Sequence, residues 1–421
     1  MKASIQIAHT PPADSDSGKS TPKTLDALTI PFHLPQLGDE EKAAVQKVMD
    51  SGWLTTGPVS MGFEQDFARF TGAPHAIAVN SCTAALHLAL EAIGLQPGDE
   101  VLTTPYTFAA TAEVVRYFDA KPCLIDIDPH TFNLSPEQLE KTKGITWNPA
   151  KAKAIIPVHF AGLPCDMDAI MDFAQRNKLY VIEDAAHALP TCYKGRMVGT
   201  LGDITAFSFY VTKTITTGEG GMITTAHGEL ADRMRMMRLH GISRDAWKRY
   251  SAEGSWFYEI HQPGFKYNLT DLAAAIGVEQ LKKAWDMTKQ RVDIAAQYDQ
   301  AFGQHPALII PPAPQEDDTT HSRHLYPLRF NPKRLRISRD AFIEEMKAAG
   351  IGTSVHFIPL HIHPYYRDTY GYQPEDLPHA LNAYQQVMSL PIYSGMTEAG
   401  VEQVMDTVLR IANAHLKPEL L

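Results

Sequence analysis

Short apolar runs alternate with amphipathic stretches from about Leu34 to Leu281. The runs that predict strands are His75–Val79, Glu100–Thr104, Pro122–Ile127, Ala154–Phe160, Leu179–Asp184, Thr205–Tyr210 and Gly221–Thr225. Helical periodicity between the earlier runs predicts helices at Thr83–Ile93, Thr111–Phe118 and Met167–Asn177. Strands that are apolar on both faces and separated by helices are typical of a mostly parallel sheet covered on both sides. The pattern therefore predicts an α/β domain over residues 34–281.

The character of the chain changes after Leu281. A long helical stretch leads into a proline-rich break, after which the pattern predicts strands at Leu325–Phe330 and Thr353–Phe357 and helices at Arg339–Ala349 and Glu398–Ala414. We interpret residues 282–421 as a second, smaller α+β domain. Residues 1–33 are rich in Ser, Thr, Pro and Asp and have too little apolar surface to fold alone. They are predicted to form a polar, disordered tail.

Composition and charge narrow the class of protein. Apolar residues make up 44% of the chain and charged residues 20%, which is ordinary for a globular enzyme. The formal net charge of −10 gives no general attraction to nucleic acid or anionic lipid, so neither partner is expected. The four cysteines are widely separated, and the chain has no apolar leader and no apolar run of membrane-spanning length. These features predict a soluble, cytoplasmic protein.

Residues that could take part in binding or catalysis follow several predicted strands, at the edge of the sheet where ligands bind in such folds. Thr83 opens a helix whose N-terminus is suited to an anion, although Ser-Cys-Thr is also an ordinary N-cap. Asp184 ends one strand and either caps a helix or holds a proton on a ring nitrogen. Lys213 follows another strand, where a buried amine is suited to Schiff-base chemistry but an isolated lysine is usually exposed. Phe108 is either a core residue or a stacking partner for a planar ring. Together, these features predict a site for a phosphate-bearing aldehyde cofactor.

A longer series of ordered motifs resembles the DegT–DnrJ–StrS family. The motifs are SGWLTTGP (51–58), SCTAALHLAL (81–90), PGDEVLTTPYTFAAT (97–111), PVHFAGLPCDMDAI (157–170), VIEDAAHALPTCYKGRMVG (181–199), FSFYVTKTITTGEGGMITT (207–225), FKYNLTDLAAAIGVEQL (265–281), VHFIPLH (355–361) and SLPIYSGMT (389–397). The resemblance excludes only the polar tail. It implies an aspartate aminotransferase-like fold of type I, with a large domain built on a mostly parallel mixed sheet and a smaller C-terminal α+β domain. It also implies the cofactor pyridoxal 5'-phosphate (PLP) and amino transfer to nucleotide-linked keto-sugars.

The resemblance assigns roles to individual cofactor-binding residues. Lys213 takes the position of the catalytic lysine that holds PLP as a Schiff base. Ser208, Thr83 and Ala84 are expected to bind the cofactor phosphate. Asp184 is expected to pair with the pyridine nitrogen.

Three further residues complete the implied cofactor site. Phe108 is expected to stack on the ring. His187 stands where many relatives have a glutamine that reaches the phenolic oxygen, and its protonation is open. Asn268 matches an asparagine that reaches the phosphate bound by the neighbouring subunit, which implies a homodimer with shared active sites.

The resemblance is closest to the C4-aminating branch of the family, which includes enzymes of the aminoarabinose pathway. We therefore expect glutamate as the amino donor and C4 of a UDP-4-keto sugar as the acceptor. A local basic cluster either contacts the diphosphate of the substrate or forms a solvated helix end and loop; it comprises Arg238, Arg244, Lys248 and Arg249. His324, His356 and His361 are further candidates for the sugar site.

Several alternatives remain open at this point. Amination at C3 of a dTDP- or UDP-3-keto sugar requires the same cofactor and fold. A sugar 3-dehydratase of this family carries histidine at the position of Lys213, so it is disfavoured. A non-catalytic regulatory protein on the same fold would need a partner-binding surface, and no nucleic-acid-binding motif is visible. A metal site built from His356, His361 and His363 is disfavoured because no carboxylate or cysteine joins them at ligand spacing.

Overall fold

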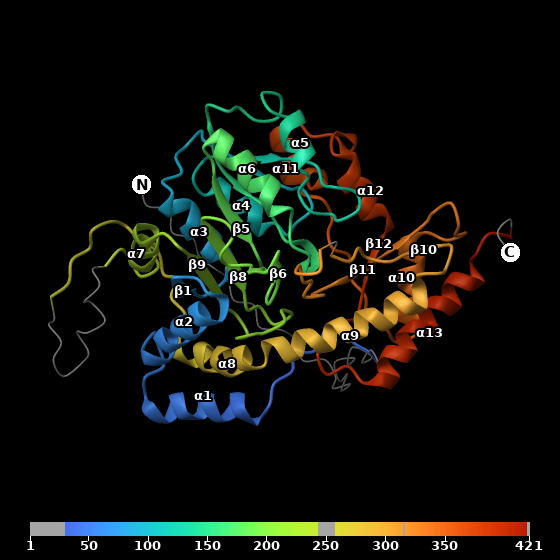
Figure 1. The fold of residues 1–421 in the computed structure, drawn as a ribbon, viewed down its shortest axis with the longest axis horizontal. Helices are drawn as coiled ribbons and strands as arrows, with labels where there is room; N and C mark the ends of the chain where they lie inside the picture. Colours follow the sequence, from blue (N-terminus) through green and yellow to red (C-terminus); the bar gives the residue numbers. More distant parts are fainter. Residues whose placement is uncertain (1–29, 243–256, 315, 419–421) are drawn as a thin grey trace, which may run out of the picture.

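A seven-stranded sheet forms the centre of the larger part of the molecule (Figure 1). The computed structural model describes residues 30–242, 257–314 and 316–418. In spatial order the sheet contains β1 (His75–Val79), β9 (Gly221–Thr225), β8 (Ile204–Ser208), β5 (Tyr180–Asp184), β4 (Ala152–Ile156), β2 (Glu100–Thr103) and β3 (Lys121–Leu124). Only β9 is antiparallel to its neighbours β1 and β8. The prediction of a mostly parallel sheet in an α/β fold is therefore confirmed.

Successive side chains on each strand enter different hydrophobic clusters, because strand side chains alternate between the two faces. Val181 on β5 and Phe207 on β8 belong to the first cluster. Their neighbours Ile182 and Ala206 belong to the second cluster. The first cluster is covered by α2 (Pro58–Thr71), α6 (Met167–Asn177) and α8 (Asp271–Lys282). The second is covered by α3 (Cys82–Ala92), α4 (Ala110–Arg116) and α7 (Gly228–Met237). Burial on both faces explains why the strands are apolar at successive positions.

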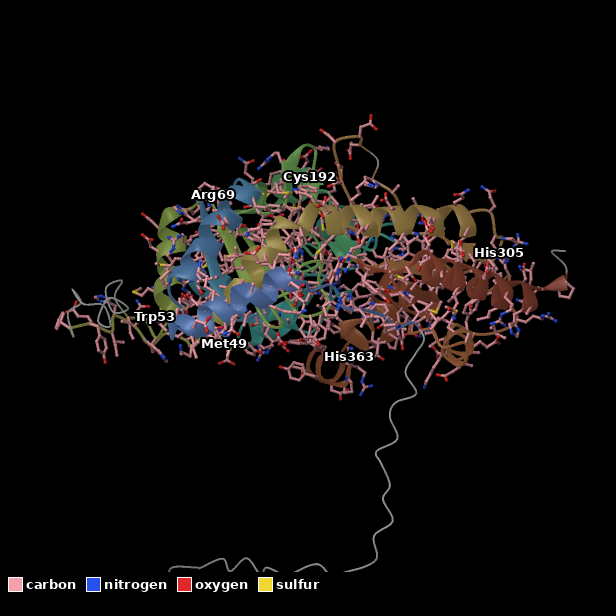
Figure 2. All side chains as sticks on the ribbon, turned by 90° about the horizontal axis from the view of Figure 1, so that it is seen from below. Met49, Trp53, Arg69, Cys192, His305 and His363 are labelled. Carbon is pink, nitrogen blue, oxygen red and sulfur yellow. The ribbon has the colours of Figure 1, made fainter. Side chains whose placement is uncertain are left out.

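Three smaller elements lie around this core. Helix α1 (Asp39–Ser51) packs against α8 on the underside of the molecule and leaves Met49 at the surface (Figure 2). Helix α5 is Pro136–Lys141, and a short hairpin is formed by β6 (Cys192–Tyr193) and β7 (Arg196–Met197). None of these elements was predicted from the apolar pattern.

A second, antiparallel sheet lies beyond the long helix α9 (Ala284–Phe302). It contains β10 (Leu308–Ile309), β11 (Tyr326–Phe330) and β12 (Val387–Leu390). The helices of this part are α10 (Arg339–Ala348), α11 (Pro364–Tyr370), α12 (Pro378–Gln386) and α13 (Glu398–Ala414). Its hydrophobic cluster combines this sheet with α9, α10 and α13. Helix α9 contributes to this cluster and, through Ala284 and Met287, to the first one. The cluster also includes Ile30, which bridges to Ile351, so the prediction that the disordered tail extends to residue 33 is wrong for residues 30–33.

The predicted strand Thr353–Phe357 is wrong. Within that segment only Ser354 pairs in a β-bridge, with Ser389, and no ladder continues from it. His356 and Phe357 are consecutive in sequence and both line the same cavity, so their side chains do not alternate as in a strand.

All four cysteines are free thiols. Within the ranges given above, no helix combines the length and apolarity needed to cross a bilayer.

Candidate active site

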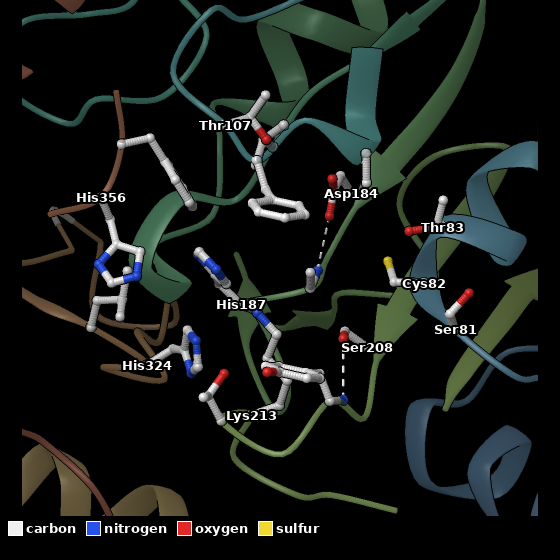
Figure 3. A pocket seen from close by; sticks show the side chains of 18 of the residues that line it. Ser81, Cys82, Thr83, Thr107, Asp184, His187, Ser208, Lys213, His324 and His356 are labelled. Atoms are coloured by element: carbon white, nitrogen blue, oxygen red, sulfur yellow. Dashed lines mark hydrogen bonds between the residues drawn. The ribbon is translucent and has the colours of Figure 1, made fainter. Parts of the chain in front are cut away.

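A cavity of about 620 Å³ lies at the carboxyl ends of the parallel strands (Figure 3). Residues from both parts of the molecule line it. The larger part contributes Ser81, Cys82, Thr83, Thr107, Phe108, Asp184, His187, Ser208 and Lys213, and the smaller part contributes His324, His356, Phe357 and Ile392. The structure thus brings Lys213 and Asp184, which are 29 positions apart in the sequence, to one cavity. Its volume is within the usual range for a small-molecule site.

The N-terminus of α3 forms one end of the cavity. The Ser81 hydroxyl accepts a hydrogen bond from the Ala84 backbone N–H at 3.0 Å and so caps the helix. Thr83 lines the cavity, as predicted. Ala84 does not, and because its N–H is bound to Ser81, the expectation that Ala84 donates to a phosphate disagrees with the structure. Ser208, at the end of β8, lies across from this helix (Figure 3).

Glycine at position 221 is required where β9 passes the turn before α3. A Cβ atom at Gly221 would lie 2.6 Å from the Ser81 carbonyl carbon, closer than backbone atoms allow. The close approach holds the start of α3 against the sheet, beside Ser208, whose partner in the register is Gly221.

Asp184 is buried at the end of β5. Its Oδ2 accepts a hydrogen bond from the Thr111 hydroxyl at 2.7 Å, and its Oδ1 accepts one from the Ala186 N–H at 3.1 Å. Thr107 and Thr111 are joined by a further hydroxyl–hydroxyl bond of 2.8 Å. Burial raises the pKa of Asp184, while the Thr111 bond and the charge of Lys213 oppose the increase. A protonated ring nitrogen beside Asp184 would, like the charge of Lys213, favour the ionised form of the Asp184 carboxylate.

Lys213 lies in the turn after β8, which a hydrogen bond from its N–H to the Tyr210 carbonyl holds at 2.9 Å. Its side chain forms no salt bridge within the described residues, although Asp184 lines the same cavity. Burial lowers the pKa of Lys213 to about 8, and the charges of Cys82 and Asp184 limit the decrease. A depressed pKa leaves a substantial fraction of the amine neutral and nucleophilic near neutral pH.

His187 is a neutral hydrogen-bond donor to the cavity. Its Nδ1 accepts the Ala161 N–H at 3.3 Å, so the ring proton lies on Nε2. Burial and the charge of Lys213 hold the pKa of His187 well below its usual range. His324 lies beside it, with ring centroids 4.5 Å apart. Both observations favour the neutral imidazole with its proton on Nε2, the point that the sequence left open.

Phe108 and Asn268 take unexpected positions. Phe108 lines the cavity, yet it is 67% exposed, so no described residue of this chain covers its outer face. Asn268 is absent from the residues that line the cavity. Its amide donates to the Thr56 hydroxyl at 2.6 Å and accepts from Lys266.

The predicted basic cluster does not form a substrate site around Arg238. The Arg238 guanidinium pairs with the Glu64 carboxylate and donates to the Ala78 carbonyl at 2.8 Å, away from the cavity. The expectation that Arg238 contacts substrate therefore disagrees with the structure. Arg244, Lys248 and Arg249 lie outside the described residues.

The candidate metal-binding histidines do not converge. His356 lines the cavity and bonds to the Ser389 hydroxyl at 2.9 Å, whereas His361 is buried against the Pro374 carbonyl at 3.0 Å. His363 lies at the periphery of the molecule (Figure 2). In the described part of the chain, no group of three or more potential ligands is placed to hold a metal ion.

Sequence reasoning missed three further groups near the cavity. His33 lines it directly, and Arg291 lies behind it, bonded to the carbonyls of His324 and Ile392. Behind Asp184, the buried pair of His159 and Glu183 is joined at 2.9 Å. For Arg291 a signal was present: it is a charged residue on the apolar face of α9, at helical spacing from residues 294, 298 and 302.

The residues around the cavity fit PLP. A buried amine, a buried carboxylate at a strand end, a helix N-terminus and an aromatic face are together the groups that this cofactor needs. The fold and the site define a PLP-dependent aminotransferase of fold type I.

The chain belongs to the DegT/DnrJ/EryC1/StrS aminotransferase family, whose sequence profile matches residues 35–409. It is 50% identical over 380 residues to the spore coat polysaccharide biosynthesis protein SpsC of Bacillus subtilis, covering 90% of this chain and 96% of SpsC. It is 52% identical over 384 residues to the uncharacterized protein MJ1066 of Methanocaldococcus jannaschii, covering 91% and 98%. A solved structure of the putative sugar aminotransferase Spr1654 from Streptococcus pneumoniae, in its PMP form, superposes with a TM-score of 0.84 at 31% identity, covering 92% of this chain and 100% of that one.

Proposed function

We propose that this enzyme transfers an amino group from an amino acid, glutamate in our proposal, to a nucleotide-linked keto-sugar, at C4 of a UDP-4-keto sugar. Two observations support a sugar acceptor: SpsC is named for polysaccharide biosynthesis, and solved relatives are described as sugar aminotransferases. The motifs SGWLTTGP (51–58) and GISRDAWKRY (241–250) resemble those of the C4-aminating branch and so support the C4 position. Amino transfer rests on one observation above all, the shared cavity of Lys213 and Asp184.

The proposed role of Lys213 has two parts. When bound, PLP supplies an aldehyde for covalent attachment and a ring that accepts electrons from a deprotonated carbon. Lys213 Nζ would hold the cofactor at rest and, as a free neutral amine, would take up the proton that leaves the donor's Cα. Its lowered pKa favours the neutral amine that both tasks require.

The other cavity residues hold and tune the cofactor in this proposal. Asp184 keeps a proton on the ring nitrogen, supported by its bonds from Thr111 and Ala186. Thr83, Ser208 and the N-terminus of α3 bind the phosphate. His187 would donate its Nε2–H to the phenolic oxygen, because its Nδ1 accepts the Ala161 N–H.

We also propose that the active enzyme is a homodimer with shared active sites. Phe108 is exposed at the cavity, and an exposed ring of this size beside a cofactor site favours a covering partner. Asn268 does not line the cavity of its own subunit, which is consistent with a role in the neighbouring subunit's site, and its amide is positioned by Thr56 and Lys266. We expect the enzyme to act in the cytoplasm, as its free cysteines favour.

A substrate panel tests the proposed function. Purified, PLP-loaded protein is incubated with glutamate and each of several UDP- and dTDP-linked 4-keto and 3-keto sugars, and amino-sugar formation is measured by mass spectrometry. We expect the highest kcat/KM with a UDP-4-keto sugar and no product from Lys213→Ala. Preference for a 3-keto sugar would contradict the C4 position, and absence of any amino-sugar product would contradict the proposed function.

A further inference from the structure

Arg291 is a buried cation without a counter-ion beside the active-site cavity. It is 1% exposed, and its Nη1 donates to the carbonyl oxygens of Ile392 at 2.6 Å and His324 at 3.3 Å, two residues that line the cavity. Its Nε has no hydrogen-bond partner, and no carboxylate of the described residues forms a salt bridge with it. A cation in this setting is strongly unfavourable unless an anion compensates it.

Two histidines at the same end of the cavity carry buried nitrogens without partners. His33 Nε2 and His324 Nδ1 make no hydrogen bond, although both residues line the cavity and His324 is only 5% exposed. Burial and the charge of Arg291 lower the pKa of His33 to about 4, and burial with neighbouring positive groups holds the pKa of His324 well below its usual range. These pKa shifts favour neutral rings, and a neutral imidazole has one N–H to donate. The N–H of His33 is directed to the Val211 carbonyl, so His324 is the ring of this pair that can donate to a ligand.

We propose that this end of the cavity, formed by His33, His324 and Ile392 and backed by Arg291, binds the α-carboxylate of the amino-acid donor. We name these four residues the carboxylate subsite. The inference rests on the proposed function, because it assigns a place to the donor in that reaction. A carboxylate accepts several hydrogen bonds, and its negative charge would compensate the positive charge of Arg291.

The position of Lys213 favours an α-carboxylate over the diphosphate of a nucleotide sugar. The donor's amine must replace the Lys213 amine, and the α-carboxylate is bonded to the same carbon as that amine. It must therefore lie within a few ångströms of Lys213, whose pKa is itself lowered in part by the charge of Arg291. His324 lies next to Lys213 and His187 in the cavity (Figure 3).

The proposal is tested with Arg291→Met, which keeps the length of the side chain and removes its charge. The matched control is Lys289→Met, on the same helix but with a side chain that is 73% exposed and paired only with Asp293. Glutarate, a dicarboxylate without an amine, is titrated calorimetrically into each PLP-loaded protein. The rate at which the cofactor's visible absorbance decreases is then measured with L-glutamate and with 4-aminobutyrate, which lacks the α-carboxylate.

We expect Arg291→Met to weaken glutarate binding and to lower kcat/KM for L-glutamate by roughly 10- to 100-fold, with little effect on 4-aminobutyrate. Lys289→Met should match the wild type. Arg291→Lys, which restores the charge, should recover part of the loss. If Arg291→Met does not fold, His324→Gln replaces it, and a selective loss with L-glutamate is again expected.

Other results would overturn the proposal. Equal losses with L-glutamate and 4-aminobutyrate would show a general structural role for Arg291. Unchanged glutarate binding with weakened binding of UDP would assign the subsite to the diphosphate. A wild-type protein that reacts with no amino acid would contradict the proposed function itself, whereas a reactive wild type with an equally reactive Arg291→Met would contradict only the carboxylate subsite.

Discussion

Replacement of Glu183 by glutamine is expected to destabilise the fold although it changes only one atom. Glu183 and His159 are both fully buried. Glu183 Oε1 accepts from the Gly202 N–H at 2.8 Å and the Thr205 hydroxyl at 2.7 Å, and Oε2 accepts from His159 Nε2 at 2.9 Å. His159 Nδ1 accepts the Cys165 N–H at 3.0 Å, so Nε2 must carry the proton. The carboxylate therefore satisfies three donors at once.

Glutamine cannot satisfy the same three donors. If its oxygen keeps the two bonds at the Oε1 position, its NH₂ group faces the N–H of His159, and the His159 tautomer cannot change without breaking the bond from Cys165. One buried charge-assisted hydrogen bond is lost and its donor is left unsatisfied, which costs about 2–3 kcal/mol. With about 2.1 cal/mol/K of unfolding entropy per residue, this lowers Tm by about 3 °C.

Chemical denaturation of PLP-loaded protein measures this loss. The matched control is Glu137→Gln, because Glu137 is 71% exposed and pairs only with Lys141 across one helical turn; its effect should stay below about 0.5 kcal/mol. A Glu183→Gln variant as stable as the control would refute the assigned proton on His159 Nε2. Replacing both partners with His159→Phe and Glu183→Leu should cost less than the sum of the single changes, because neither partner is then left buried without the other. The donors of Gly202, Thr205 and Cys165 lose their acceptors in the single and the double variants alike.

Three further predictions follow from the site. Burial lowers the pKa of His356 to about 4, so between pH 6.5 and 4 the unfolded chain binds a proton that the folded chain does not, and stability should fall as the pH falls through this window. Denaturation at pH 6.5 and pH 5 should show that His356→Gln removes about 1.6 kcal/mol of this loss. An unchanged pH slope in that variant would contradict the neutral His356. Gly221→Ala should weaken PLP binding at least about 10-fold, because the added Cβ displaces the turn at Ser81. Fluorescence titration of the apoprotein measures this loss. The control Gly62→Ala, which has open space around its Cβ, should bind PLP normally. Mixing inactive Lys213→Ala with inactive Asn268→Ala should restore up to about a quarter of wild-type activity, because half of the dimers are mixed and each mixed dimer has one intact site of two. No recovery after verified subunit exchange would contradict shared active sites.

Local sequence patterns were sufficient to predict the sheet and the chemistry at its edge. Asp184 and Lys213 each follow an apolar strand, and in a parallel sheet such strand ends meet on one edge, so their shared cavity could be expected. Thr83 was found for the same reason, whereas Ser208 was assigned by the resemblance to the family. In each case the strand itself gives the position of the polar residue.

Apart from Ala84, whose N–H is capped locally by Ser81, the errors concern residues whose environment is set by distant parts of the chain. Arg238 belongs to a cluster that is basic in sequence, but its partner Glu64 lies 174 residues earlier and no local pattern links them. The segment 353–357 is apolar enough to predict a strand, yet its residues wrap around a cavity that only the assembled fold creates. Arg291 could have been noticed as a charge on an apolar helix face, but its two carbonyl partners come from other segments.

The most direct test of the account is the crystal structure of the PLP-loaded protein. We expect continuous electron density from Lys213 Nζ to the cofactor, and the ring nitrogen within about 2.7–3.2 Å of an Asp184 oxygen. A cofactor attached to a different lysine, or a ring nitrogen directed away from Asp184, would contradict the central claim that these two side chains act on one ring.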